Sequence, residues 1–238
     1  MDILIWVRTL VSRFFLFLIM FLYLIPFLLV LVLPKKWFRE STLFFTCTYF
    51  FYWLVLKASF LRFNFIGRHN IPDEPSIIIA NHESSLDIPI IGYLLNKHPH
   101  TWLATTWLMK SPILRFILPQ LAILVDTSSA IKGMRSLLQV IKEVNGTRQH
   151  IVIFPEGGRF TDGKVHDFFS GFVILAKKMG RPVVPIKIFN LNKVYPPNSF
   201  LVYDYPVKAI VGEPFIKGDR EDDASFKKRV HDWFIEQE

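Results

Sequence analysis

The 238-residue sequence predicts an α/β fold, with a mostly parallel sheet flanked by helices, preceded by an N-terminal hydrophobic two-helix membrane hairpin. Three observations predict it. Two long apolar runs fill the first 60 residues, short β-rich runs alternate with helical patterns after residue 61, and several apolar strands end abruptly in polar turns. We therefore expect a membrane-anchoring hairpin over residues 1–61 and one α/β domain over residues 62–238.

The first apolar run, residues 14–33, contains no charged side chain. Its 20 residues rise about 1.5 Å each in a helix, which matches a hydrocarbon core of roughly 30 Å. Pro26 lies in the middle and predicts a kink. The second run, residues 41–56, has 16 uncharged residues, at or just below the usual spanning minimum of about 17. Basic residues flank both runs on every side, so charge leaves open whether the hairpin crosses the bilayer or enters one leaflet.

Composition and charge narrow the class of partner. Hydrophobic residues make up 51% of the chain, charged residues 20%, and the formal net charge is +8. Basic proteins bind nucleic acids, anionic membranes or anionic substrates. The apolar composition favours membrane lipids, and no nucleic-acid-binding motif is present, so we expect no nucleic-acid partner. The single cysteine excludes a disulfide scaffold, and the histidine spacing predicts no metal site.

Strands and helices alternate in the predicted α/β domain. The expected strands are Arg62–Ile66, Ser76–Ala80, Thr101–Thr105, Ala122–Val125, His150–Phe154, Val183–Ile188, Phe200–Tyr203 and Val207–Val211. The expected helices are Ile88–Asn96, Pro112–Leu118, Ser129–Val144, Phe168–Met179 and Ala224–Gln237. Such alternation is typical of a largely parallel sheet covered on both faces.

The strand Ser76–Ala80 runs into a polar cluster that begins at Asn81 and ends at Asp87, where a helix starts. Ligands of open α/β sheets bind beyond the carboxyl ends of the strands, so His82 is delivered to a place where active sites occur. A carboxylate beside an imidazole fixes its tautomer and raises its basicity, which makes a general base. The alternative is a surface turn histidine and a helix N-cap at Asp87.

A second strand, His150–Phe154, also ends in a polar turn. Gly157 and Gly158 allow the backbone to approach a ligand closely and to expose N–H groups to an anion. Arg159 offers two parallel hydrogen bonds to a phosphate. The alternative is an ordinary β-turn with a solvated arginine.

These two turns carry a family resemblance. Asn81–Asp87, read as N-H-E-S-S-L-D, is similar to the N-H-x-x-x-x-D block of the glycerophospholipid acyltransferases, and F-P-E-G-G-R-F at 154–160 resembles their F-P-E-G-T-R-S block. Lys110 with Leu121–Asp126 resembles their second block, and Val183–Ile186 their fourth. Four blocks in order behind a hydrophobic hairpin cover most of the chain.

The resemblance implies a reaction and its residues. His82 would be the general base on an acceptor hydroxyl, oriented by Asp87, and the hydroxyl would attack the thioester of acyl-CoA or acyl-carrier protein. An activated thioester needs no metal and no organic cofactor. The implied substrate-binding residues are Asn81, which would position the loop, Lys110, Glu156, Gly157, Gly158, Arg159 on the phosphate, and Pro185 at the wall of the acyl site.

The sequence departs from the family pattern around the implied acceptor site. Gly158 stands where the family has Thr, Phe160 where it has Ser, and Thr127 where it has Arg. Lys132 or Arg135 is a candidate replacement for the missing cation. The resemblance therefore implies an acceptor that is either lysophosphatidic acid or another lysophospholipid.

We thus expect a membrane-bound O-acyltransferase of glycerophospholipid synthesis, with its catalytic domain facing the cytosol, where thioester donors are available. Two alternatives stay open. One is a membrane-anchored lipid-binding or scaffold protein without turnover. The other is a hydrolase in which water replaces the acceptor.

Overall fold

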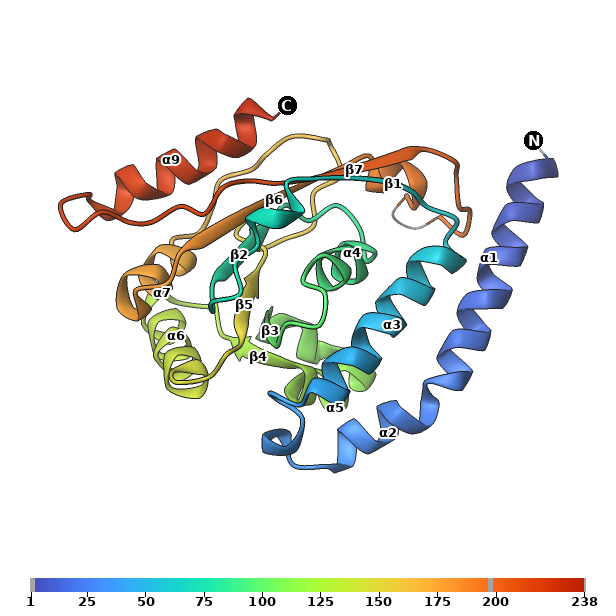
Figure 1. Cartoon of the computed structure of the whole chain (residues 1–238), viewed down its shortest axis with the longest axis horizontal. Helices are drawn as coiled ribbons and strands as arrows, with labels where there is room; N and C mark the ends of the chain where they lie inside the picture. The colour runs from blue at the N-terminus through green and yellow to red at the C-terminus, as the bar shows by residue number, and fades with distance from the viewer. Residues whose placement is uncertain (1–2, 197–198, 238) are drawn as a thin grey trace.

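The computed structural model describes residues 3–196 and 199–237, and seven strands among them form one sheet (Figure 1). The spatial order is β1-β7-β6-β2-β5-β3-β4, and every neighbouring pair is parallel except β6 and β7. The strands are β1 (Arg62–Ile66), β2 (Ile77–Ala80), β3 (His100–Thr105), β4 (Ala122–Val125), β5 (His150–Ile153), β6 (Val183–Phe189) and β7 (Pro206–Val211). The predicted mostly parallel α/β sheet is confirmed.

The central strands are buried on both faces, which is why they read as continuous apolar runs instead of alternating ones. In β2, Ile78 and Ala80 belong to one core cluster, and Ile77 and Ile79 belong to the other. The central strands β6, β2 and β5 are parallel. The carboxyl ends of β2 and β5 therefore lie at the same edge of the sheet, and the two polar turns follow there.

Helices cover both faces of the sheet (Figure 1). One face is packed by α6 (Ala130–Val144), α7 (Gly171–Met179) and α9 (Asp223–Glu236). The other is packed by α4 (Asp87–Leu94), with α3 (Thr42–Ala58) outside it and α1 (Ile3–Leu22) outside α3. The remaining helical segments are α2 (Leu24–Val32), α5 (Pro112–Leu121), α8 (Leu191–Val194) and the 3-10 helices Lys35–Trp37, Arg68–Asn70 and Thr106–Lys110.

The first helix of the N-terminal hairpin starts and ends earlier in the chain than the predicted apolar run of residues 14–33. Helix α1 ends at Leu22 and α2 begins at Leu24, so the run 14–33 is interrupted and does not form one straight helix. Pro26 explains the break, because it has no N–H for the carbonyl of Leu22, four residues back. Within the described part of the chain, Ile3–Leu22 is the one helix long and apolar enough to cross a membrane.

Two predicted elements of the α/β domain need correction. The expected strand Phe200–Tyr203 is irregular, because its backbone bonds elsewhere: Val202 N–H donates to Thr9 Oγ1 at 3.0 Å, and Tyr203 N–H donates to Val194 O at 2.8 Å. The helix predicted from Phe168 begins at Gly171, because Phe169 N–H donates to Pro155 O at 2.8 Å and so belongs to the preceding turn.

Candidate active site

His82 and Asp87 meet where β2 ends and α4 begins. The Nδ1 atom of His82 lies 2.6 Å from Oδ2 of Asp87. The His82 side chain is 16% exposed and the Asp87 side chain is fully buried, so only the histidine reaches solvent. Since a carboxylate accepts hydrogen bonds, Nδ1 carries the proton and Nε2 is left with a free lone pair. The turn between strand and helix thus unites two side chains that a continuous helix would separate.

Asp87 is held by more than the histidine. Its Oδ2 also accepts hydrogen bonds from the backbone N–H groups of Glu83 and Ser84, each at 2.8 Å. Burial raises the pKa of Asp87, while the bonds from His82 and the two backbone groups oppose that rise. Its Oδ1 is buried without a hydrogen-bond partner in the described structure. Three converging donors fix the carboxylate and, through it, the imidazole ring.

An aromatic ring lies against the histidine. Phe154, the residue after β5, stacks on His82 with ring centroids 4.1 Å apart and planes 16° apart. Trp102 of β3 stacks on Phe154 in turn at 6.1 Å. One face of the imidazole is therefore covered by protein, which limits its motion.

Asn81 and Glu83 hold the histidine loop to the sheet. The Asn81 side chain donates to Ile188 O and accepts from Ile188 N–H, both at 2.8 Å, so it extends the pairing of β2 with β6. Glu83 Oε2 accepts from the backbone N–H groups of Leu191 at 3.2 Å and Asn192 at 3.4 Å. Burial raises the pKa of Glu83 to about 7. The buried amide of Asn81 is thus engaged within the protein, where it ties the start of the loop to β6.

The turn after β5 packs directly against this loop. Phe160 N–H donates to His82 O at 2.9 Å, which joins the two motifs. Glu156 is buried, and its carboxylate accepts from His166 N–H at 3.2 Å; burial raises its pKa. Gly157 has φ +70°, and a Cβ there would lie 2.5 Å from the Phe169 ring. Its N–H donates to Phe154 O at 3.1 Å, so the expectation that this N–H faces an anion is wrong.

Two departures from the family pattern depend on each other. A Cβ added to Gly158 would lie 3.3 Å from the ring of Phe160, a tight contact. Phe160 itself stacks on His166, with centroids 3.8 Å apart. A threonine at 158 would crowd this aromatic pair, so a glycine there suits a phenylalanine two residues later.

A pocket of about 220 Å³ opens beside the histidine loop. Its lining includes Arg159 from the second motif and Tyr195 from the segment after α8. The other lining residues are Glu83, Ser84, Ser85, Pro196 and Ser199. Arg159 is exposed, and within the described residues no ion pair engages its guanidinium group. The pocket is therefore polar, with a cation available at its wall and the His82–Asp87 pair next to it in the chain.

Three other expected residues lie apart from this cluster. Lys110 is exposed, and its Nζ lies 5.7 Å from the centre of the Trp107 ring. Pro185 pairs with Ile79 in the sheet and packs beside Gly212 and Trp233, on the opposite face from Phe154. Lys132 is paired with Asp126 at 3.6 Å. None of the contacts described for these three residues involves His82.

Sequence reasoning missed Lys187. This lysine lies in β6, is 3% exposed, and donates from Nζ to Phe234 O at 3.2 Å. Its charge lowers the pKa values of both Glu83 and Glu156, against the effect of their burial. A lysine within the apolar strand VVPIKIF was the available signal, because a buried charge needs partners.

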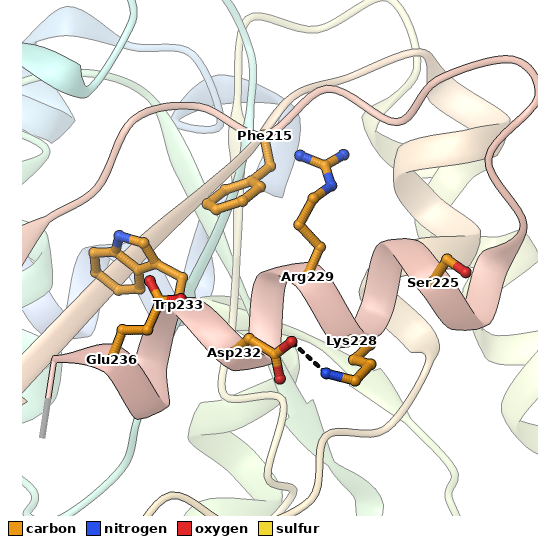
Figure 2. A pocket seen from close by; sticks show the side chains of 7 residues that line it. All are labelled: Phe215, Ser225, Lys228, Arg229, Asp232, Trp233 and Glu236. Carbon is orange, nitrogen blue, oxygen red and sulfur yellow. Dashed lines mark hydrogen bonds and ion pairs between the residues drawn. The ribbon is translucent and has the colours of Figure 1, made fainter.

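A larger hollow of about 370 Å³ lies along α9 (Figure 2). Three of its charged lining groups are already paired: Lys228 with Asp232 at 2.5 Å, and Arg229 with Glu221 at 2.9 Å. Arg229 also lies over the ring of Phe215. The residues that line this hollow do not place a base beside a nucleophile, so we assign the chemistry to the His82 turn. No group of three His, Cys, Asp or Glu side chains in the described residues could hold a metal ion.

The model of the Acyltransferase family matches residues 62–189, more than half of the chain. The chain belongs to the Acyltransferase family. The match starts at β1, ends at β6, and includes both motif-bearing turns.

Curated relatives and a solved structure agree with this membership. A chloroplastic 1-acyl-sn-glycerol-3-phosphate acyltransferase of Brassica napus is 26% identical over 170 residues, which are 68% of this chain and 47% of the relative. The enzyme of that name from Pseudomonas aeruginosa is 25% identical over 188 residues, 77% of this chain and 72% of the relative. The chain spans a little under half the length of the first curated relatives that it matches. The crystal structure of the 1-acyl-sn-glycerophosphate acyltransferase of Thermotoga maritima has the same fold, with a TM-score of 0.74 and 23% identity over 97% of this chain and 96% of that one.

Proposed function

We propose that this protein transfers a fatty acyl group from an acyl thioester to the free hydroxyl of 1-acyl-glycerol-3-phosphate or a related lysophospholipid. The observation that carries the proposal is the 2.6 Å contact between His82 and a fully buried Asp87, on a turn at the carboxyl edge of the sheet. Family membership and the names of the relatives support the same reaction class.

The chemistry follows from the free lone pair on His82 Nε2. It takes the proton of the acceptor hydroxyl as the hydroxyl oxygen attacks the thioester carbonyl carbon. The tetrahedral intermediate then collapses, the C–S bond breaks, and the proton held by His82 leaves with the thiol. Asp87 stabilises the transient imidazolium and keeps Nδ1 protonated throughout.

The acceptor headgroup fits the pocket walled by Arg159 and the residues that follow His82. A guanidinium group recognises a phosphate monoester by two parallel hydrogen bonds. Glu156, Gly157 and Gly158 form the turn that presents Arg159, in which Glu156 is buried and Gly157 has φ +70°. The terminal phosphate of lysophosphatidic acid is the simplest occupant of this pocket.

The donor is acyl-CoA or acyl-carrier protein, and no metal or organic cofactor takes part, since a thioester is already activated.

The hairpin over residues 1–61 anchors the α/β domain of residues 62–238 at a membrane. Several outward side chains of α1 and α2 support this, because they are apolar and more than half exposed: Ile3, Leu10, Phe14, Phe17, Phe21 and Ile25. The domain faces the cytosol, where thioester donors are available.

A transfer assay with the purified full chain in detergent tests the proposal. It offers labelled acyl-CoA and labelled acyl-carrier protein to a panel of lysolipids, with His82→Ala beside the wild type. His69→Ala, at an exposed histidine of the 3-10 helix Arg68–Asn70, is the matched control. We expect product from wild type and from His69→Ala, and none above background from His82→Ala.

Two outcomes would replace the proposal. Lysolipid bound to the purified protein, with no transfer from either donor, indicates a lipid-binding protein on this fold. Fatty acid released without dependence on any acceptor indicates a hydrolase. Arg159→Ala refines the acceptor assignment: its KM for a phosphate-bearing acceptor should rise, and an unchanged KM removes Arg159 from the phosphate.

A further inference from the structure

Helix α1 carries a polar stripe along one side of an otherwise apolar surface. Arg8, Thr9, Ser12 and Arg13 follow the spacing of a single helical face. Thr9 and Ser12 are fully buried, and Thr9 Oγ1 accepts from Val202 N–H at 3.0 Å. The stripe therefore faces the α/β domain, while apolar side chains elsewhere on α1 are exposed. A plain membrane anchor has no need of such a stripe.

Arg13 makes the most extensive contacts of the stripe. Its Nη1 donates to the Tyr195 hydroxyl at 2.6 Å, and its Nη2 donates to Phe200 O at 2.7 Å. The guanidinium also lies over both rings, 4.7 Å from the centroid of Tyr195 and 4.8 Å from that of Phe200. A cation within an apolar helix is retained only where partners such as these offset its desolvation.

Tyr195 connects this clamp to the candidate active site. It lines the same pocket as Arg159, Ser84 and Ser85. One side of Tyr195 thus contacts α1, and another forms the pocket wall that faces the acceptor headgroup. Arg13 itself is not among the lining residues, so it reaches the pocket through Tyr195 and through Phe200, the neighbour in the chain of the lining residue Ser199.

We propose that Arg13 is a positioning residue for acceptor binding. By fixing Tyr195, it completes the pocket that takes the phosphate headgroup, so α1 acts on acceptor recognition through the side chain of Arg13. The inference rests on the proposed function, because it assigns the pocket beside Arg159 to the acceptor.

The test uses Arg13→Gln, Tyr195→Phe and the double variant of the full-length protein. Arg8→Gln is the matched control: Arg8 belongs to the same stripe and donates to Phe60 O at 2.6 Å, but it contacts no residue that lines the pocket. The acceptor KM, the donor KM and kcat are measured by transfer. The Kd of 1-acyl-glycerol-3-phosphate is measured by thermal shift without donor, where no reaction occurs.

Loss of the hydrogen bond to a charged group should raise the acceptor KM and Kd of each single variant about five- to tenfold. The acceptor KM and Kd of the double variant should be no higher than those of the weaker-binding single variant, because both substitutions remove the same Arg13–Tyr195 hydrogen bond. Donor KM, kcat and all constants of Arg8→Gln should stay within about twofold of wild type. Arg13→Lys, which keeps the charge but cannot hold both acceptors in one fork, should fall between wild type and Arg13→Gln. Should Arg13→Gln fail to fold, Arg13→Lys and Tyr195→Phe carry the test.

Unchanged acceptor KM and Kd in Arg13→Gln would overturn the inference while the proposed function stands. Equal losses in Arg8→Gln would overturn it too, since they would mean that helix docking in general is what matters. If the wild type binds the lysolipid but transfers nothing, a weakened Kd in Arg13→Gln still supports the positioning role, and only the reaction is lost. A wild type that binds no lysolipid refutes both.

Discussion

Asp87→Asn separates the charge of the carboxylate from its shape. Asparagine keeps nearly the same volume, and its carbonyl oxygen can take the place of Oδ2 and accept from His82, Glu83 and Ser84. Its amide NH₂ then falls at the Oδ1 position, which has no partner in the described structure. The variant loses the negative charge next to the imidazole and gains a buried donor with no acceptor.

The size of the effect follows from Coulomb's law. The charge centres of the carboxylate and an imidazolium in this contact lie about 4 Å apart, which at an effective dielectric constant of about 20 gives roughly 4 kcal/mol. That stabilisation exists only when His82 holds the proton of the acceptor, so its loss should slow turnover about a thousandfold. The unpaired NH₂ costs about 1–3 kcal/mol of folding stability, partly offset because no buried carboxylate is left to desolvate.

The assay is steady-state transfer to 1-acyl-glycerol-3-phosphate at saturating donor, with circular dichroism melts as the check on folding. We expect kcat to fall to about 0.1% of wild type with the acceptor KM within about threefold, and the variant His82→Ala/Asp87→Asn to be no slower than His82→Ala alone. More than a tenth of wild-type kcat in a folded Asp87→Asn would refute the reasoning, as would losses that add in the double variant.

Three further predictions concern stability. Gly157→Ala should lower the free energy of unfolding by about 3 kcal/mol and Gly163→Ala by about 1 kcal/mol, because both glycines have positive φ but only Gly157 meets a ring; equal losses in urea melts would contradict this. Burial raises the pKa of Glu83 to about 7 from an ordinary 4.5, so the free energy of unfolding should fall by about 3 kcal/mol as pH rises through that interval. Glu83→Gln should flatten this dependence of stability on pH, and an unchanged slope in the variant would count against the reasoning. Burial lowers the pKa of His150 to about 3, so stability is lost as pH falls below 6.5; His150→Asn, which retains an acceptor for Ser76 N–H, should lose less on acidification, and an identical acid profile would disprove the cause.

The parts of the site that are local in sequence could be predicted from it. His82 and Asp87 lie five residues apart on one strand–turn–helix corner, and their meeting follows from that geometry. The sheet followed from buried runs such as Ile77–Ala80, because a strand covered on both faces needs no alternation. Gly158 and Phe160 are also near neighbours in the sequence. That a side chain at 158 would crowd the Phe160 ring could be seen only once the structure placed that ring.

The features that depend on contacts between distant segments could not be predicted from the sequence. Phe200–Tyr203 has the composition of a strand, yet Thr9 of α1 takes one of its backbone donors, a partner that lies nearly the whole chain away. Lys187 of β6 donates to Phe234 O of α9, 47 residues later, so the sequence shows a lysine in an apolar strand but not the partner that it meets. The face on which Pro185 lies was decided by the register of β6 against β2.

The docked stripe of α1 also has a consequence for how the chain is made. Arg13 is translated 182 residues before Tyr195, and Thr9 is translated 193 residues before Val202. At about 5–20 residues per second, roughly ten seconds or more pass between the synthesis of Arg13 and that of Tyr195. During that time the unpaired charge of Arg13 favours the headgroup layer over the hydrocarbon centre of a bilayer. The newly made helix therefore waits at the lipid surface, and only the end of synthesis supplies the segment that can seat it.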